Sequence, residues 1–402
     1  MKFWLKLIFI NILFYSFISC GSSDSKDDLV QEQLLVSTLN TFSSNQESQS
    51  IKVTANIDWV TDNNLDWVTV SPNFGTNNGT IIITVASNPN LTLRLGNITV
   101  IGGNLRRAIL ITQEAKASTA NDLDPNKSPA QNFDLSTWKL NTPENNGSGF
   151  SKTITVTEIN NNYQNTNYFY TGTDGGLVFK CPIAGFKTSA NTSYTRVELR
   201  EMLRGTNTSI PTQGVNKNNW VFGSSPEADK NAAAGFDGEM NATLAVNHVT
   251  TTGSSSHVGR VIIGQIHAND DEPIRLYYRK LPNNSLGSIY FAHEPRDGFG
   301  SEQWHTLIGS RSNSASNPTD GIALDEKFSY QIKTVNNTLI VTISREGKPD
   351  VIKEVDMSNS GFDSSGQYQY FKAGLYQGNN SGNADDYVQA TFYRLEKSHT
   401  TN

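Results

Sequence analysis

Three short segments of the chain alternate apolar residues with polar residues whose side chains are chemically reactive. The segments are 196–201 (RVELRE), 265–267 (QIH) and 370–376 (YFKAGLY). Successive side chains of a β-strand point to opposite faces of a sheet. One face of each segment would therefore present its alternating polar residues, namely Arg196, Glu198 and Arg200, then Gln265 and His267, then Tyr370, Lys372 and Tyr376. These groups are guanidinium, carboxylate, amide, imidazole, ammonium and phenol. The pattern therefore predicts strands that carry a carboxylate-binding and proton-transferring surface.

Most of the remaining sequence has the pattern of short β-strands separated by turns. Runs rich in Val, Ile, Thr, Tyr and Phe recur between clusters of Gly, Asn and Ser, and only residues 225–235 suggest a helical turn. This pattern is typical of all-β sandwiches and jelly rolls. With 402 residues the chain is long enough for two domains, and we expect both to be all-β.

The N-terminus has the features of a targeting segment. A positively charged start precedes an apolar run, residues 7–18, and Ser19 and Cys20 follow. The run is too short for a comfortable transmembrane helix and fits a secretory signal. It resembles a bacterial lipoprotein signal, which implies lipidation of Cys20 and a secreted protein held at the outer membrane and exposed at the cell surface. Phe17 stands where such signals usually have Leu, so a plain signal peptide is the alternative.

Composition shifts along the chain indicate how it is organised. A polar stretch with two prolines separates two β-rich regions and has the character of a linker. We expect a signal peptide (1–20), a tether (21–34), a small β module (35–115), a linker (116–130) and a large domain (131–402). The only cysteine besides Cys20 is Cys181, which we expect to be a small buried residue on a strand without a disulfide partner.

The order of strands and turns in residues 35–115 resembles the BACON-type immunoglobulin-like β-sandwich found on carbohydrate-active lipoproteins. Two functions remain open for such a module, namely sugar binding and a spacer role, and we favour the spacer. Trp59 and Trp67 are as easily core residues as a sugar platform. The residues that carry the resemblance are Trp59, 67–69, Ser71-Pro72, Gly75, Asn88, 94–96 and 111–113.

The charge of the chain limits the partners that we expect. The net charge is −6 and no long basic run is present, which argues against a nucleic-acid partner. A local basic groove for an acidic polymer remains compatible with this balance, because recognition depends on charges at the site.

Four stretches, taken together and in order, resemble the alginate lyases of polysaccharide lyase family 7. They are 133–143 (FDLSTWKLNTP), 196–203 (RVELREML), 265–267 and 370–376. The resemblance spans about residues 130–397. It implies a β-jelly roll, a concanavalin-like sandwich, whose concave sheet forms the substrate groove. One departure is Gly378, where the family often has Gln.

Elimination chemistry gives the polar groups of these segments a common purpose. A uronic acid polymer linked at O4 is cleaved when the C5 proton leaves and the C4–O bond breaks. An enzyme must stabilise the charge that moves onto the carboxylate, and it needs a base at C5 and an acid at the leaving oxygen. Arg196 and Gln265 are suited to the carboxylate, His267 to the base and Tyr376 to the acid. Tyr376 would act as a base only beside a cation such as Lys372.

The resemblance also implies a division of labour among these residues. It assigns catalysis to Arg196, Gln265, His267 and Tyr376. We expect the remaining polar residues of the segments to bind substrate or orient the groups that do: Glu198, Arg200, Tyr370, Lys372 and Gln377. Read one at a time, the same residues are as compatible with a cross-strand salt-bridge ladder and a structural histidine.

No metal or cofactor is expected, because no ligand cluster of suitable spacing occurs. We interpret the acidic run 270–272 (DDE) as a solvated loop. The other histidines are interpreted as surface or loop residues, with His248 and His257 as possible groove residues. Sugar stacking or core packing are both open for four aromatic residues, Trp220, Tyr277, Tyr278 and Trp304.

The predicted function is that of a monomeric alginate lyase with alginate as its partner. Ile266 between Gln265 and His267 favours guluronate-containing blocks within the family, while endo or exo action stays open. Two other classes remain: an alginate-binding protein without turnover, and a glucan hydrolase on a similar jelly roll. The hydrolase would need two carboxylates at the scissile bond, and no Glu-x-Asp-x-Glu strand is present.

Overall fold

The computed structural model describes residues 31–89, 93–114, 116 and 123–401. Two compact units account for them: the first contains the described residues up to 88 together with 94–114, and the second contains the described residues of 89–93 and of 115–402. The predicted signal peptide, the lipidation site Cys20 and most of the predicted tether lie outside the described residues. Within the described part of the chain, no helix is long and apolar enough to cross a membrane.

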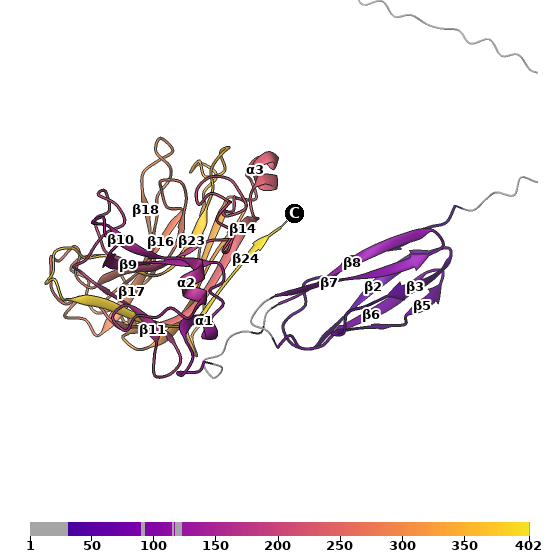
Figure 1. The fold of residues 1–402 in the computed structure, drawn as a ribbon, viewed down its shortest axis with the longest axis horizontal. Helices are drawn as coiled ribbons and strands as arrows, with labels where there is room; N and C mark the ends of the chain where they lie inside the picture. Colours follow the sequence, from indigo (N-terminus) through magenta and orange to yellow (C-terminus); the bar gives the residue numbers. More distant parts are fainter. Residues whose placement is uncertain (1–30, 90–92, 115, 117–122, 402) are drawn as a thin grey trace, which may run out of the picture. The chain divides into compact units, whose positions relative to one another are not determined.

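The N-terminal unit is a sandwich of two four-stranded antiparallel sheets (Figure 1). Apolar residues alternate inward, so Ile51 and Val53 are buried while Lys52 between them is exposed. Trp59 is a core residue whose indole Nε1 donates a hydrogen bond to the carbonyl of Asn77, at 2.8 Å. One sheet has the order β1 (Leu34–Val36), β2 (Glu47–Ala55), β6 (Gly79–Val85) and β4 (Val68–Ser71), and the other has β5 (Phe74–Thr76), β3 (Asp58–Asp62), β7 (Arg94–Gly102) and β8 (Leu105–Gln113).

The second unit consists of two large antiparallel sheets (Figure 1), which confirms the expected jelly roll. The nine-stranded sheet has the order β10 (Ser151–Ile154), β9 (Trp138–Asn145), β13 (Arg196–Glu201), β23 (Tyr370–Gln377), β15 (Arg260–His267), β16 (Ile274–Arg279), β17 (Leu286–His293) and β18 (Gln303–Ile308), with β19 (Ile322–Ala323) paired to β17. The seven-stranded sheet has the order β11 (Phe169–Thr171), β12 (Leu177–Pro182), β24 (Tyr387–Thr400), β14 (Phe236–His248), β20 (Lys327–Val335), β21 (Thr338–Ser344) and β22 (Val351–Asp356).

The main hydrophobic core of this unit is built from apolar residues of both sheets. Leu199, Ile266 and Phe371 come from the three alternating segments and are completely buried in it. From the other sheet, the rings of Phe179 and Phe392 join the same core with centroids 5.0 Å apart. The polar residues between the buried ones must therefore lie on the opposite side of the nine-stranded sheet, which we call its outer face.

Three short helices complete the unit: α1 (Pro129–Asn132), α2 (Val156–Asn160) and α3 (Glu227–Ala232). α3 confirms the helical turn expected within 225–235. Cys181 lies on β12 and is completely buried, as predicted. Among the described residues it has no disulfide partner. Burial raises the pKa of its thiol to about 12, so this cysteine is unreactive at neutral pH.

Candidate active site

The antiparallel register brings the three alternating segments side by side on the outer face. β23 lies between β13 and β15, although it follows both in the sequence. Lys372 pairs with Arg200 on one side and with Gln265 on the other. In the same way, Tyr376 pairs with Arg196, and Tyr370 pairs with His267. Residues from distant parts of the chain thus form one cluster.

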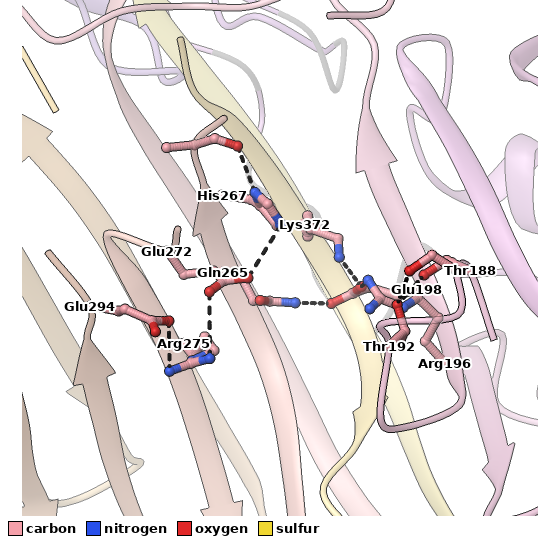
Figure 2. Close-up of polar contacts among 12 residues, drawn as sticks. Thr188, Thr192, Arg196, Glu198, Gln265, His267, Glu272, Arg275, Glu294 and Lys372 are labelled. Atoms are coloured by element: carbon pink, nitrogen blue, oxygen red, sulfur yellow. Dashed lines mark hydrogen bonds and ion pairs between the residues drawn. The ribbon is translucent and has the colours of Figure 1, made fainter. Parts of the chain in front are cut away.

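Glu198 is the centre of this cluster (Figure 2). Its carboxylate lies 2.5 Å from Nζ of Lys372 and 3.1 Å from Nη1 of Arg196, and it accepts a hydrogen bond from Nε2 of Gln265. Burial alone would raise the pKa of Glu198, but the two cations and these hydrogen bonds lower it overall. Glu198 is therefore an enclosed anion that positions its three neighbours.

Arg196 and Gln265 each keep a buried polar atom that has no partner among the described residues. These atoms are Nε of Arg196, a donor, and Oε1 of Gln265, an acceptor. Buried polar atoms without partners are uncommon in folded proteins and call for an explanation. Arg196 and Lys372 also carry one positive charge more than Glu198 neutralises. This excess positive charge favours the binding of an anion at the cluster.

His267 is held as a neutral base. Its Nδ1 lies 2.6 Å from the carbonyl oxygen of Ala268, which can only accept, so Nδ1 carries the hydrogen. The ring stacks on Tyr370 with centroids 5.0 Å apart and 11° between the planes. Burial, with Lys372 and Arg196 as further causes, lowers the pKa of His267 to about 3. At neutral pH the lone pair of Nε2 is therefore available.

Tyr376 is held as a protonated phenol. The guanidinium carbon of Arg196 lies 4.0 Å from the centroid of its ring. Burial raises the pKa of Tyr376, and the nearby Arg196 only partly opposes this shift. The arrangement favours proton donation by Tyr376 over the base role that was open from the sequence.

Two of the expected substrate-binding residues have different surroundings. Gln377 is completely buried on the inner face, and its Nε2 donates to the carbonyl of Cys181 at 3.2 Å. The substrate-binding role predicted for Gln377 is wrong, because Gln377 follows Tyr376 by one residue and its side chain points to the opposite face. The guanidinium of Arg200 donates to the carbonyls of Glu201 and Thr212, and it lies 3.9 Å from the ring centroid of Tyr370. Arg200 therefore supports the ring on which His267 stacks.

The acidic run 270–272 is not simply the solvated loop that we expected. Glu272 is only 16% exposed and lies 3.3 Å from Nε2 of His267 and 3.4 Å from Nη1 of Arg275. Arg275 in turn contacts Glu294 at 3.0 Å and also Glu302. Figure 2 shows this chain of contacts from His267 to Glu294. The period-two pattern of β16 places Arg275 on the outer face. This pattern was the signal in the sequence from which the contacts of Arg275 could have been predicted.

The other histidines and the aromatic residues divide between core and outer face. His293 is completely buried between the carbonyl of Pro273 and the hydroxyl of Ser360, and His399 lies on β24 with Nε2 2.8 Å from Glu201; the surface or loop positions expected for both are wrong. Core packing holds for Trp220 and Tyr278, whereas a second cluster on the outer face contains Tyr277, Tyr290, Trp304 and Tyr376.

The ring of Tyr194 connects His257 to Tyr376 on the outer face. The imidazole of His257 makes an edge contact with Tyr194, at 6.0 Å between centroids, and Tyr194 makes one with Tyr376, at 5.9 Å. Tyr194 belongs to none of the motifs recognised in the sequence. Within the described residues, no group of three or more His, Cys, Asp or Glu side chains could hold a metal ion.

Fold and site together define the class of the protein. An antiparallel jelly roll presents an anion-binding arginine, an amide, a neutral imidazole and a protonated phenol within one cluster. These are the groups that proton abstraction beside a carboxylate requires. The protein is an enzyme of the polysaccharide lyase class.

Comparison with known proteins identifies the family within this class. Residues 133–399 match the family model of alginate lyases, and residues 58–114 match that of a putative N-terminal binding domain, the BACON domain. The chain belongs to the alginate lyase family. The resemblances to alginate lyases and to the BACON module are thereby confirmed.

Individual relatives support the assignment over most of their length. An alginate lyase of Klebsiella pneumoniae is 56% identical over 279 residues, which are 67% of this chain and 91% of the relative. The crystal structure of an alginate lyase from Klebsiella pneumoniae matches with a TM-score of 0.67 at 55% identity, over 68% of this chain and 98% of that chain. A family 7 alginate lyase solved in complex with substrate matches with a TM-score of 0.50 at 26% identity, over 69% and 99% of the two chains.

Proposed function

We propose that the protein cleaves the (1→4) bond of alginate by β-elimination and leaves an unsaturated uronate at the new non-reducing end. The positive charge that Arg196 and Lys372 carry beyond the single carboxylate of Glu198 supports this proposal, because it lies beside a neutral imidazole and a protonated phenol. A uronate supplies the anion, and its carboxylate oxygens accept hydrogen bonds from the guanidinium of Arg196, whose side chain is 12% exposed.

The reaction follows from these positions. The guanidinium of Arg196 stabilises the charge that moves onto the carboxylate when C5 loses its proton. Nε2 of His267 takes this proton, and the electron pair of the broken C5–H bond forms the C4–C5 double bond. The C4–O bond breaks, and the phenolic proton of Tyr376 passes to the departing oxygen. Exchange with water then returns His267 and Tyr376 to their starting states.

The direct test is the ultraviolet absorbance of the new double bond, which is conjugated with the carboxylate. Purified protein mixed with alginate should show a steady rise, and mass spectrometry should show unsaturated oligouronates. A neutral glucan serves as the control and should give no rise. Folded protein that binds alginate without any such product would instead be an alginate-binding protein, and the lyase proposal would fail.

The proposal extends to substrates that contain guluronate. Ile266 lies between Gln265 and His267 but is completely buried in the core, so it acts on the substrate only through the positions of its neighbours. Initial rates on separate guluronate, mannuronate and mixed blocks test the preference. The variant I266V should shift the ratio of these rates without abolishing turnover; an identical ratio would remove Ile266 from the argument.

We further propose that the enzyme is a monomer, secreted and anchored in the outer membrane through a lipid on Cys20, with the N-terminal module as a spacer. The apolar run before Cys20 and the core position of Trp59 support this view. Labelling of cells with a clickable fatty acid should mark the wild type and not C20S. Protease treatment of intact cells tests surface exposure, and light scattering of the soluble part tests the monomer.

A further inference from the structure

Lys139 of β9 extends the row of polar groups on the outer face beyond the catalytic cluster. Lys139 pairs with Arg200, Arg200 pairs with Lys372, and Lys372 pairs with Gln265. Neighbouring strands lie about 4.8 Å apart, so the backbones at Lys139 and Gln265 are separated by roughly 14 Å across the sheet. Lys139 was part of a motif in the sequence, but no role was assigned to it.

The surroundings of Lys139 contain cations and no matching anion. The charged groups that act on it are Arg200 from β13, Lys372 from β23 and Arg204 beyond the end of β13. Within the described part of the chain, no carboxylate pairs with its ammonium group. Burial and these three cations lower its pKa to about 8. The free protein therefore bears an unfavourable charge at this position, which an external anion would relieve.

The neighbouring cations have partners that Lys139 lacks. Lys372 is paired with Glu198 at 2.5 Å, and Arg200 donates to backbone carbonyls. The side chain of Lys139 is partly exposed, so solvent reaches it. The ammonium group is thus both unpaired and accessible, whereas Arg200 is neither.

We propose that Lys139 forms a carboxylate-binding subsite. It holds one uronate of an alginate chain while another uronate of the same alginate chain reacts at Arg196 and Gln265. The inference rests on the proposed function, because a polyuronate carries a carboxylate on every sugar. A chain that crosses β15, β23, β13 and β9 brings one of these carboxylates to Lys139. The subsite fixes how the polymer lies across the sheet and takes no part in the proton transfers.

The test compares K139Q with K139R and with the control K353Q, which removes an exposed lysine from β22 of the other sheet. K139Q should raise KM for long guluronate chains about tenfold, the worth of one hydrogen bond to a charged group, with kcat within twofold of the wild type. K139R and K353Q should leave KM near its original value. For the shortest cleavable oligouronates, which do not span to Lys139, K139Q should have little effect.

A second measurement separates this proposal from the lyase function. Calorimetric binding of alginate is compared between Y376F and the double variant Y376F/K139Q, so the subsite is tested even if no turnover occurs. Circular dichroism verifies folding, and K139M, which keeps the apolar stem, replaces K139Q if that variant is unstable. Unchanged KM and affinity in folded K139Q and K139M would overturn the proposal. A fall in kcat alone would also overturn it, because it would place Lys139 at the reacting centre.

Discussion

Nε2 of His267 lies 3.3 Å from the carboxylate oxygen Oε1 of Glu272. Because Nδ1 already donates to Ala268, Nε2 is the nitrogen that accepts the substrate proton. The imidazolium that forms then faces a carboxylate, which stabilises it. Burial and Lys372 keep the resting imidazole neutral, so the two influences together favour a base that is free before the reaction and stabilised once it has been protonated.

Replacing Glu272 with Gln should therefore weaken the base without dismantling the site. The amide keeps the size of the side chain but loses its charge, and we expect kcat to fall about tenfold, or about 1.4 kcal/mol. The acid limb of the kcat/KM profile should move to lower pH, since loss of the anion lowers the pKa of His267. E302Q is the matched control, because Glu302 contacts Arg275 and not His267. Equal effects in both variants would assign the loss to Arg275.

Tyr376→Phe should remove the proton donor to the leaving oxygen. General acid catalysis contributes about 10²–10⁴ in rate, and we expect kcat to fall within this range while alginate binding persists. Stopped assays of the unsaturated product and calorimetry measure the two quantities. Y370F is the control, because it keeps the ring on which His267 stacks and should lose far less activity. Near-normal turnover by Y376F would exclude Tyr376 as the acid.

Glu198→Gln should affect stability as well as activity. The change leaves Arg196 and Lys372 without their common anion in a place where Glu198 is 2% exposed. Breaking one side of a buried ion pair costs about 3–5 kcal/mol, and urea denaturation should show a loss of this order. E227Q, which breaks an exposed pair with Lys230 on α3, should change stability by less than about 1 kcal/mol. Comparable losses in the two variants would contradict the central role of Glu198.

The depressed pKa of His267 also predicts a loss of stability in mild acid. In the folded protein the pKa is about 3, whereas it is about 6.5 in an unfolded chain. Between these values the unfolded state binds the extra proton, so stability falls as the pH drops from about 6.5 towards 3. At pH 5 the loss should be about 2 kcal/mol. H267N should lose correspondingly less between pH 7 and pH 5 in urea denaturation; parallel curves would show that His267 is not the group responsible.

The alternation in the sequence predicted which side chains share a face, but not which strands become neighbours. Lys372 lies between Arg200 and Gln265 because β23 inserts between β13 and β15, and such pairing over long sequence distances leaves no local pattern. Gln377 shows the opposite case. The period of two that places Tyr376 outward also places Gln377 inward, yet the family resemblance suggested a binding role. Local geometry was the better guide there.

Glu272 and Lys139 escaped prediction for a different physical reason. A charged residue in a loop or in a mixed strand is usually solvated, and the sequence does not show which charges surround it after folding. Glu272 gains its role from the approach of β16 to the end of β15. Lys139 gains its role from the acids that are missing around it, and only the folded arrangement reveals such an absence.

The lowered pKa of Lys139 gives a final prediction on pH dependence. Its ammonium group titrates at about 8, so it loses its charge as the pH rises through this value, and KM for long chains should then increase. Lys372 also has a pKa of about 8 and contributes to the same rise in every variant. In K139R the guanidinium stays charged, so the increase of KM between pH 7 and pH 9.5 should be smaller than in the wild type. The difference between the two curves isolates Lys139, and superimposable curves would show that its charge does not contribute to substrate binding.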